Sequence, residues 1–458
     1  MHTKFIAVSL TLLACVACTK SKSQDSASVG TAGSGLQVIA ISPAQYGTSG
    51  GGTLTVTGQN FVSGAVIQLN GATCPNSTFV SASQLTCVLP ANAPATMDVT
   101  VTNPNGQFAT LSKAFNYTSF MYIGRQSTQG TVDGFQVNAS TGALVAMPGS
   151  PFATAGVQTY GVALTPTANF LYAANYQSST IAEFSVNPGT GALTTIGSAA
   201  VTGQPTGVAA DPSGKFLVVT TYGACAKYFV FSINSGTGAL AAVANSPFQD
   251  TPCQIDSGSV RFRPDGKFVY FANYDSSSIS GFAFDTTAGQ LTKISSSPFT
   301  GNGLGGPDTI AVHPSGQFLY AANTLNPGSI SAFAIDSTTG ALTAIANYPL
   351  TFASTNGAGI TVSPDGTTLY YVGKGGNAIA ALTVNLSNGQ LSAPQTLSTD
   401  MQPQDVIVDP TGRFIYTSNV SGKTASAFTR NSTSGVILGL TPATYGLGDS
   451  GGLMCSTH

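Results

Sequence analysis

The chain has 458 residues, of which only 7% are charged, and it contains 53 glycines and no tryptophan. Ordinary soluble domains carry about 25% charged residues, so the polar surface must consist mainly of Ser, Thr, Asn, Gln and Gly. The net charge of −2 comes from 15 basic and 17 acidic residues, too few cations for a basic stripe along a phosphate backbone. Nucleic acid is therefore not an expected partner. The length allows two or three domains.

The N-terminus has the pattern of an export signal. Residues 1–4 are a short basic region, and residues 5–17 form an apolar run that is too short to span a bilayer. The run ends in Leu12-Leu-Ala-Cys15-Val-Ala-Cys18, and a small residue directly before a cysteine resembles the lipobox of bacterial lipoproteins. We expect residues 1–17 to be a signal peptide and Cys18 to carry the lipid, with Cys15 or plain secretion as alternatives.

The predicted lipid anchor implies attachment to a membrane of the bacterial cell envelope, in the periplasm or at the outer-membrane surface. Residues 18–35 are rich in Ser, Gly and Thr, a composition typical of a flexible tether.

Residues 36–118 alternate short β-type runs with turn signals and show no helical periodicity. The segment contains Gly50-Gly-Gly-Thr-Leu-Thr-Val-Thr-Gly58-Gln-Asn-Phe61, followed by Cys74 and Cys87. In this order it resembles the IPT/TIG family of immunoglobulin-like domains. The resemblance implies a small β-sandwich that acts as a spacer or an interaction module.

From Phe120 to the C-terminus a unit of about fifty residues recurs, a period typical of propeller blades. Two β-rich runs flank a Pro-x-Gly turn, a third run follows, and a Thr-Gly-x-Leu turn leads into a fourth, which is the strand number of one blade. The clearest turns are Pro212-Ser-Gly-Lys-Phe216, Pro264-Asp-Gly-Lys-Phe268, Pro314-Ser-Gly-Gln-Phe318 and Pro410-Thr-Gly-Arg-Phe414.

Seven second strands can be counted in this segment, but only six innermost strands precede them. We expect the seventh innermost strand to come from the last residues, Gly452-Leu-Met-Cys-Ser456. It would join the blade that begins at Phe120, close the ring and hide both sheet edges. The sequence thus predicts an all-β chain in which residues 119–458 form a seven-bladed propeller.

The units from Pro314 to Asn323 and from Ser331 to Leu342 resemble the lactonase-type seven-bladed propeller family and the related Tyr-Val-Thr-Asn repeat propellers of microbial surface proteins. The lactonase family includes 6-phosphogluconolactonases and muconate-lactonising cyclases, and its enzymes are expected to use His, Arg and Glu near the ring's loop face. In this chain none of the innermost strands begins at a histidine, and the mature chain contains only His313 and His458. The single glutamate, Glu183, lies in a predicted third strand.

The predicted propeller fold determines on which face of the ring each loop lies. Turns after the first and third strands lie on one face, and loops after the second and fourth strands lie on the other face, where propellers usually bind ligands. The sequence alone cannot fix the cysteine pairing. The folds that the two resemblances imply suggest disulfides between Cys74 and Cys87 and between Cys225 and Cys253, with two free thiols as the alternative for the second pair, and they leave Cys455 unpaired as a packed thiol.

Several residues are candidates for the binding face. Arg261 stands where other innermost strands carry Ala or another uncharged residue, so it either binds an anionic ligand or satisfies a nearby carboxylate or carbonyl. For a hydrolase, the catalytic candidates are Asp308, Asp405, Arg261 and Arg125. The predicted ligand-binding face contains Arg125, Tyr160, Tyr176, Tyr222, Phe248, Asp256, Tyr274, Asp275, Asp308, Lys374 and Asp405.

Two strings imitate catalytic or nucleotide-binding motifs. The first, Gly448-Asp-Ser450-Gly-Gly452, matches a serine nucleophile signature, but only His458 follows it and no helix is predicted there. The second runs from Gly301 to Gly306 and has the Gly-x-Gly-x-x-Gly spacing without the helix that phosphate binding requires. No Cys/His spacing predicts a metal site, and we expect no cofactor.

Two functions remain. The favoured hypothesis is a lipid-anchored envelope protein, without catalytic activity, that presents the propeller on an immunoglobulin-like stalk to an unknown protein, peptide or carbohydrate. The alternative is a hydrolase of a sugar lactone or related ester. Lactone opening needs a general base and a group that stabilises the oxyanion, and the sequence offers few candidates for either.

Overall fold

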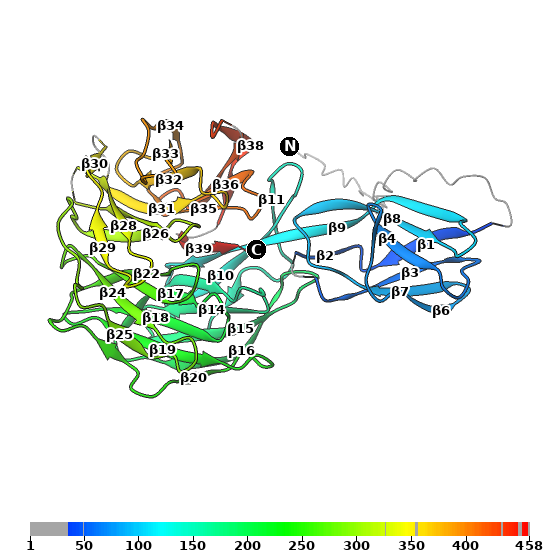
Figure 1. Cartoon of the computed structure of the whole chain (residues 1–458), viewed down its shortest axis with the longest axis horizontal. Helices are drawn as coiled ribbons and strands as arrows, with labels where there is room; N and C mark the ends of the chain where they lie inside the picture. The colour runs from blue at the N-terminus through cyan, green and yellow to red at the C-terminus, as the bar shows by residue number, and fades with distance from the viewer. Residues whose placement is uncertain are drawn as a thin grey trace, which may run out of the picture.

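The computed structural model describes residues 35–48, 50–325, 327–352, 356–431, 434–447 and 451–456. Within these ranges all the helical or strand structure is β-strand, arranged as a sandwich next to a ring of sheets (Figure 1). The predicted signal peptide, Cys15, Cys18 and residues 19–34 of the tether lie outside the described residues. No helix in the described part of the chain is long and apolar enough to cross a membrane.

The sandwich begins at residue 37 and ends within the long strand β9. Its two faces enclose one core, in which Leu54, Val56, Ile67, Val99 and Val101 are fully buried. The alternation of buried and exposed residues along each strand produces this core. One sheet has the order β1 (Gln37–Ser42), β3 (Thr53–Gln59), β7 (Gln84–Val88), β6 (Thr78–Ser81), and the other contains β5 (Ala72–Thr73), β4 (Val66–Leu69), β8 (Ala95–Thr102) and β9 (Phe108–Arg125).

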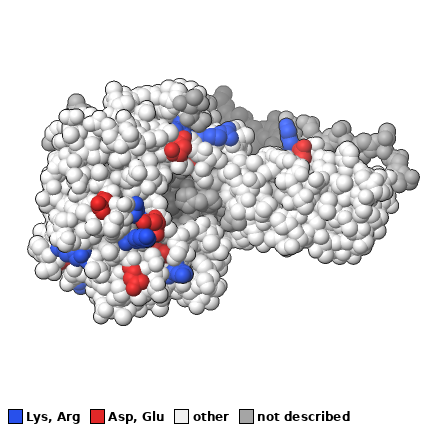
Figure 2. Space-filling view, viewed as in Figure 1, with Lys and Arg blue, Asp and Glu red and all other residues white. Residues whose placement is uncertain are grey.

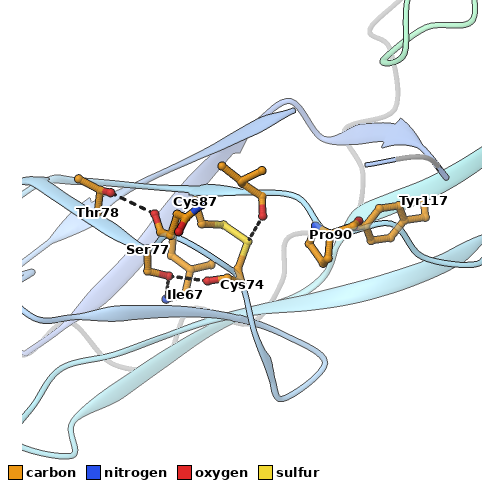
Figure 3. Close-up of a disulfide and its surroundings, with 9 residues drawn as sticks. Ile67, Cys74, Ser77, Thr78, Cys87, Pro90 and Tyr117 are labelled. Carbon is orange, nitrogen blue, oxygen red and sulfur yellow. Dashed lines mark hydrogen bonds between the residues drawn. A yellow bond between two sulfur atoms is a disulfide. The ribbon is translucent and has the colours of Figure 1, made fainter. Parts of the chain in front are cut away.

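The predicted disulfide between Cys74 and Cys87 lies inside this sandwich, with 5.9 Å between the two Cα atoms (Figure 3). Next to it, the hydroxyl of Ser77 donates a 2.9 Å hydrogen bond to the carbonyl of Cys74 and accepts one from the N–H of Ile67. The disulfide therefore holds the loop after β5 to strand β7.

The propeller has seven sheets over the described residues, each with four main strands. The inner strands are β39 (Gly451–Ser456), β13 (Thr159–Leu164), β17 (Gln204–Ala210), β22 (Ser257–Phe262), β26 (Pro307–Val312), β31 (Gly357–Val362) and β35 (Pro403–Val408). The second strands are β9, β14 (Phe170–Asn175), β18 (Phe216–Tyr222), β23 (Phe268–Asn273), β27 (Phe318–Asn323), β32 (Thr368–Gly373) and β36 (Phe414–Asn419). We number the blades 1 to 7 in this order.

The remaining strands complete each blade toward the rim. The third strands are β10 (Thr131–Val137), β15 (Thr180–Val186), β19 (Lys227–Ile233), β24 (Ser278–Phe284), β28 (Ser329–Ile335), β33 (Ala378–Thr383) and β37 (Thr424–Arg430). The outer strands are β11 (Leu144–Ala146), β16 (Leu193–Ala200), β20 (Leu240–Ala242), β25 (Leu291–Lys293), β29 (Leu342–Ala344), β34 (Gln395–Ser398) and β38 (Ile437–Gly446). Short strands β12 (Phe152–Ala153), β21 (Phe248–Gln249) and β30 (Leu350–Thr351) pair with third strands.

The predicted closure of the ring is confirmed. Strand β39 pairs antiparallel with β9, so that Met454 lies opposite Ile123 and Cys455 opposite Tyr122 (Figure 1). Inner strand β39 also contacts β35 on one side and β13 on the other, which completes the circle of inner strands. The side chain of Cys455 and the segment 448–450 lie outside the described residues.

The repeated motifs explain how neighbouring blades are joined. In five blades, a tyrosine on the second strand donates its hydroxyl to the carbonyl of the glycine in the turn after the third strand of the next blade, at 2.7–2.9 Å; the pairs are Tyr122–Gly191, Tyr172–Gly238, Tyr270–Gly340, Tyr320–Gly389 and Tyr416–Gly142. The glycine has a positive φ and packs against a phenylalanine ring of the preceding blade, as Gly340 does on Phe268. A side chain at this position would be strained and would meet the ring.

The sandwich attaches to one particular face of the propeller. Strand β9 runs without a break from the sandwich into blade 1. Beside it, strand β2 (Gln45–Gly47) pairs with β9, and the N–H of Gly47 donates to the carbonyl of Pro188 at 2.5 Å. Pro188 lies in the turn after the third strand of blade 2, so the sandwich lies on the side of the Pro-x-Gly and Thr-Gly turns. We call this side the turn face and the opposite side the mouth face.

Candidate functional site

Three tyrosines form a continuous aromatic arc on the mouth face of blades 2 and 3. The ring centre of Tyr176 lies 5.7 Å from that of Tyr160 and 5.9 Å from that of Tyr222. Tyr222 is 46% exposed, whereas Tyr160 and Tyr176 are half-buried. Burial, with the Asp308 carboxylate nearby, raises the pKa of the Tyr160 phenol, so these phenols remain neutral hydrogen-bonding groups at ordinary pH.

A pair of carboxyl groups continues the arc into blade 4. Asp256 is buried and accepts a 2.9 Å hydrogen bond from the N–H of Gly223. Burial, together with a hydrogen bond to the exposed Asp275, raises the pKa of Asp256 to about 6. Asp256 in turn raises the pKa of Tyr222, with which it also shares a hydrogen bond. The pair therefore holds a proton below about pH 6.

Asp308 connects the arc to the opposite side of the mouth. Its Oδ2 atom lies 3.5 Å from Nζ of Lys374 in blade 6 and 3.5 Å from Nε2 of Gln404 in blade 7. Burial is the main cause that raises the pKa values of Tyr160 and Tyr274. The charge of the Asp308 carboxylate raises both of them further. We call Tyr160, Tyr176, Tyr222, Tyr274, Asp256, Asp275, Asp308 and Lys374 the mouth cluster.

Asp405 lies deeper, next to the point where the ring closes. It is 3% exposed and accepts hydrogen bonds of 2.9 Å from the N–H groups of Met454 and Val406. Burial raises the pKa of Asp405 to about 6, although these donors and the charge of Arg261 act in the opposite direction. Arg261 is half-buried on inner strand β22, and its Nη1 donates a 2.9 Å hydrogen bond to the carbonyl of Val260. The prediction that Arg261 belongs to the ligand-binding face is wrong, because this residue lines a cavity bordered by Pro314 and Pro410 of the turn face.

Two of the predicted site residues have structural partners instead. Arg125 binds Asp133 of the neighbouring strand through two 2.5 Å contacts, from Nε and from Nη2. Phe248 pairs with Tyr228 through strand β21 and packs against the core between blades 3 and 4. Of the four hydrolase candidates, Asp308, Asp405 and Arg261 thus form one electrostatic group, and Arg125 is held within blade 1.

The groups most often used as bases lie away from the mouth. His313 follows inner strand β26 on the turn face, where Nδ1 contacts the Ser315 hydroxyl and Nε2 the carbonyl of Gly366. Glu183 is buried in third strand β15. Among the described residues, no group of three or more His, Cys, Asp or Glu side chains is placed to hold a metal ion.

The second predicted disulfide, between Cys225 and Cys253, is present on the mouth face with 5.1 Å between the Cα atoms. It joins the loop after β18 to the loop before β22, next to Tyr222 and Asp256. Neither Gln404 nor Asp133 was predicted from the sequence as a site residue. Gln404 could have been noticed from its place beside Asp405, but the partnership of Asp133 with Arg125 depends on strand register.

The protein's surface carries few charged side chains. In the space-filling view most visible residues are uncharged, and the acidic and basic side chains occur singly or in small mixed groups (Figure 2). The mouth cluster has three carboxyl groups, those of Asp256, Asp275 and Asp308, and one cation, Lys374, which pairs with Asp308. The mouth is therefore acidic when all its carboxyl groups are ionised.

The propeller is similar in sequence to known 6-phosphogluconolactonases. A 6-phosphogluconolactonase of Serratia proteamaculans is 25% identical over 233 residues, which cover 50% of this chain and 68% of the relative. One from an Enterobacter species is 22% identical over 299 residues, or 64% of this chain and 83% of the relative.

Solved structures show the same propeller fold. The periplasmic gluconolactonase of Pseudomonas aeruginosa is similar with a TM-score of 0.64 at 18% identity, over 74% of this chain and 99% of that structure. A protein from Lactobacillus plantarum gives a TM-score of 0.62 at 22% identity, over 74% and 100%. The model of the IPT/TIG domain matches residues 36–118, and the model described as "Lactonase, 7-bladed beta-propeller" matches residues 118–257, 230–353 and 344–445. The chain thus carries an IPT/TIG domain and belongs to the seven-bladed lactonase propeller family.

Proposed function

We propose that this chain is a membrane-tethered envelope protein that binds a neutral carbohydrate at the mouth cluster and does not hydrolyse it. The observation that carries the proposal is the aromatic arc of Tyr160, Tyr176 and Tyr222 beside the carboxylate of Asp308. Tyrosine combines an apolar ring face with a polar hydroxyl, and a sugar likewise combines C–H faces with hydroxyl groups. The partly exposed carboxylate of Asp308 adds an acceptor for those hydroxyls.

The charge of the mouth favours a neutral ligand over a phosphorylated one. The mouth cluster contains three carboxyl groups and one lysine, and only Asp308 pairs with Lys374; Arg125 is neutralised by Asp133. A phosphate group entering this mouth would meet like charges, which repel it. This supports a ligand different from the phosphorylated sugar lactone after which the curated relatives are named.

The contacts of the catalytic candidates support binding without hydrolysis. General-base catalysis needs a group within hydrogen-bonding reach of a bound nucleophile. Asp405 is occupied by two backbone N–H groups, Arg125 by Asp133, and His313 by its own turn. Asp308 is the one hydrolase candidate in the mouth cluster with a partly exposed carboxylate.

The domain arrangement supports a role in presenting the mouth face away from the membrane. The sandwich lies on the turn face, and β1 begins at the end of the sandwich farthest from the propeller (Figure 1). A lipid at Cys18 would therefore attach to the end of the stalk and leave the mouth exposed. The two disulfides support an oxidising compartment such as the envelope.

A glycan array followed by calorimetry tests the binding proposal. The full mature chain should bind a neutral glycan, and sulfated or phosphorylated versions of that glycan should bind more weakly. Tyr176→Ala and Asp308→Ala should each lower the affinity by roughly tenfold. Phe108→Ala is the control, because Phe108 is 71% exposed on the stalk. Equal affinities in all variants, or preference for the anionic glycans, would contradict the proposal.

The lactonase alternative is favoured by family membership and by the electrostatic group of Asp308, Asp405 and Arg261. It predicts turnover of a sugar lactone or related ester that is lost in Asp308→Asn and Arg261→Ala. If a broad lactone and ester panel is hydrolysed only at the rate in buffer, this alternative is wrong.

A further inference from the structure

The turn-face end of the central channel is a separate cavity of about 490 Å³. Three Pro-x-Gly turns border its opening through Pro314, Pro364 and Pro410. Its walls are the ends of the inner strands, and the side chains that line it are mostly apolar, with residues such as Leu164, Val208, Val362, Ile407, Val408 and Met454. The volume falls within the range of small-molecule pockets, about 300–1,000 Å³.

One charged residue, Arg261, lines this cavity, and Thr361 is the other polar residue among its described lining. The corresponding positions of neighbouring inner strands are small, such as Ala163, Ala209 and Ala311, according to the register of each inner strand with its second strand. The guanidinium therefore projects from a position where blades 2, 3 and 5 carry only alanine, and blades 6 and 7 carry Thr361 and Ile407.

The guanidinium has unused hydrogen-bonding capacity. Arginine offers five N–H donors, and the hydrogen bond to Val260 uses one nitrogen. Arg261 makes no ion pair with any residue that the structure describes. The nearest acidic group that influences it, Asp405, already accepts from Met454 and Val406, and burial lowers the pKa of Arg261. Arg261 therefore has no anion in direct contact among the described residues, and a cation withdrawn from water is unfavourable unless a group pairs with it.

We propose that this cavity binds an aliphatic monocarboxylate, with its carboxylate on Arg261 and its hydrocarbon chain along the apolar walls. A guanidinium matches a carboxylate by two parallel hydrogen bonds. The walls offer no second cation for a phosphate dianion, and a neutral hydrocarbon would leave the charge unpaired. The site is distinct from the mouth cluster and does not depend on the proposed carbohydrate binding.

Calorimetry on the full mature chain tests the proposal with hexanoate, octanoate, n-octanol and inorganic phosphate. The affinity should rise about fourfold for each added methylene, as burial of each CH₂ predicts. Octanol should bind on the order of tenfold more weakly than octanoate, because it lacks the charge-assisted hydrogen bonds. Octanoate should also raise the melting temperature.

Two variants locate the site. Arg261→Met should weaken octanoate binding by on the order of tenfold or more and leave octanol unchanged, and it should fold, because an unpaired buried charge is removed. Ala209→Leu should weaken both ligands by filling the cavity while keeping Arg261. Lys267→Met is the control, since Lys267 is an exposed cation in a turn of the same face. Failure of octanoate to bind, equal binding by phosphate, or an unchanged affinity in Arg261→Met would each overturn the proposal.

Discussion

The backbone N–H of Met454 donates a 2.9 Å hydrogen bond to the carboxylate of Asp405, which joins the last inner strand of the chain to its neighbour in the ring. A second hydrogen bond holds the same inner strand, β39: the hydroxyl of Ser418, on β36, donates to the carbonyl of Gly452 at 2.7 Å. The seventh blade boundary is thus fixed by side chains that reach the backbone of β39. We expect Asp405→Ala to lower the free energy of unfolding by about 1–3 kcal/mol, because the N–H of Met454 loses its acceptor.

The matched variant for this bond is Asp405→Asn, whose amide oxygen can still accept from Met454. It should lose much less stability than Asp405→Ala. The chain has no tryptophan, so urea unfolding should be followed by circular dichroism. Equal losses in the two variants would show that the hydrogen bond to Met454 contributes nothing.

Asp405 also makes the stability depend on pH. Its pKa rises from 3.8 to about 6 on folding, so the folded state holds this proton more tightly than the unfolded state. The contribution is fully present below about pH 4 and is lost as the pH rises through 6. The shift corresponds to roughly 3 kcal/mol at most.

The measurement is the free energy of unfolding between pH 4 and 8 for the wild type and Asp405→Asn. The wild type should become less stable as the pH rises, and the variant should show a smaller slope. Asp256 also has a pKa raised to about 6, so the double variant with Asp256→Asn should be flatter still. A slope that Asp405→Asn leaves unchanged would contradict this assignment.

The turn glycines should be the least replaceable residues between blades. Gly340 has φ +72° and packs on the ring of Phe268, and the carbonyl of Gly340 accepts from Tyr270. Gly340→Ala combines a strained backbone with overpacking, which should cost about 2–4 kcal/mol. The control is Gly301→Ala, because Gly301 has φ +86° with open space where a Cβ would lie. Melting temperatures compare the two, and equal losses would show that contact with Phe268 is unimportant.

The mouth-face disulfide should stabilise the propeller. It closes a segment with a sequence separation of 28, for which the loss of unfolded-state entropy amounts to roughly 3–4 kcal/mol. The double variant Cys225→Ser, Cys253→Ser should therefore melt earlier, and it should also weaken ligand binding at Tyr222. A variant that lacks Cys74 and Cys87 serves as the control, since that disulfide lies in the stalk. Unchanged melting of the propeller without Cys225 and Cys253 would contradict the prediction.

The predicted anchor can be tested in cells by metabolic labelling with palmitate. The full-length chain should incorporate the label and partition with membranes. Cys18→Ser should abolish both, whereas Cys15→Ser should retain them. Labelling that persists in Cys18→Ser and disappears in Cys15→Ser would move the lipid to Cys15.

The architecture of the propeller was predictable because its signals are local and repeated. The Pro-x-Gly turn appears in the structure with Asp211 accepting from the N–H groups of Lys215 and Phe216, at 2.8 and 2.7 Å. Closure by the C-terminal strand followed from counting inner strands, and the pairing of Met454 with Ile123 confirms it. Both arguments need only residues that are close in sequence or repeated at a fixed period.

The partners within the site could not be predicted in the same way. The binding of Arg125 to Asp133 depends on the register between β9 and β10, and the contact of Asp308 with Gln404 joins blades 5 and 7 across the channel. The role of Asp405 depends on a backbone N–H, which no side-chain pattern reveals. Tyr160, Tyr176 and Tyr274 were predicted for the ligand-binding face, and they are half-buried there; the ring of Tyr176 packs against that of Tyr160.

The most direct test of binding without hydrolysis at the mouth cluster is an NMR time course of the protein with glucono-δ-lactone and the neutral glycan that the array selects. Saturation transfer from the protein should reach the glycan resonances, and the lactone should disappear at the rate measured in buffer. The transfer should be lost in Tyr176→Ala. Faster loss of the lactone with wild type than with Asp308→Asn, or no transfer to any sugar, would contradict the account.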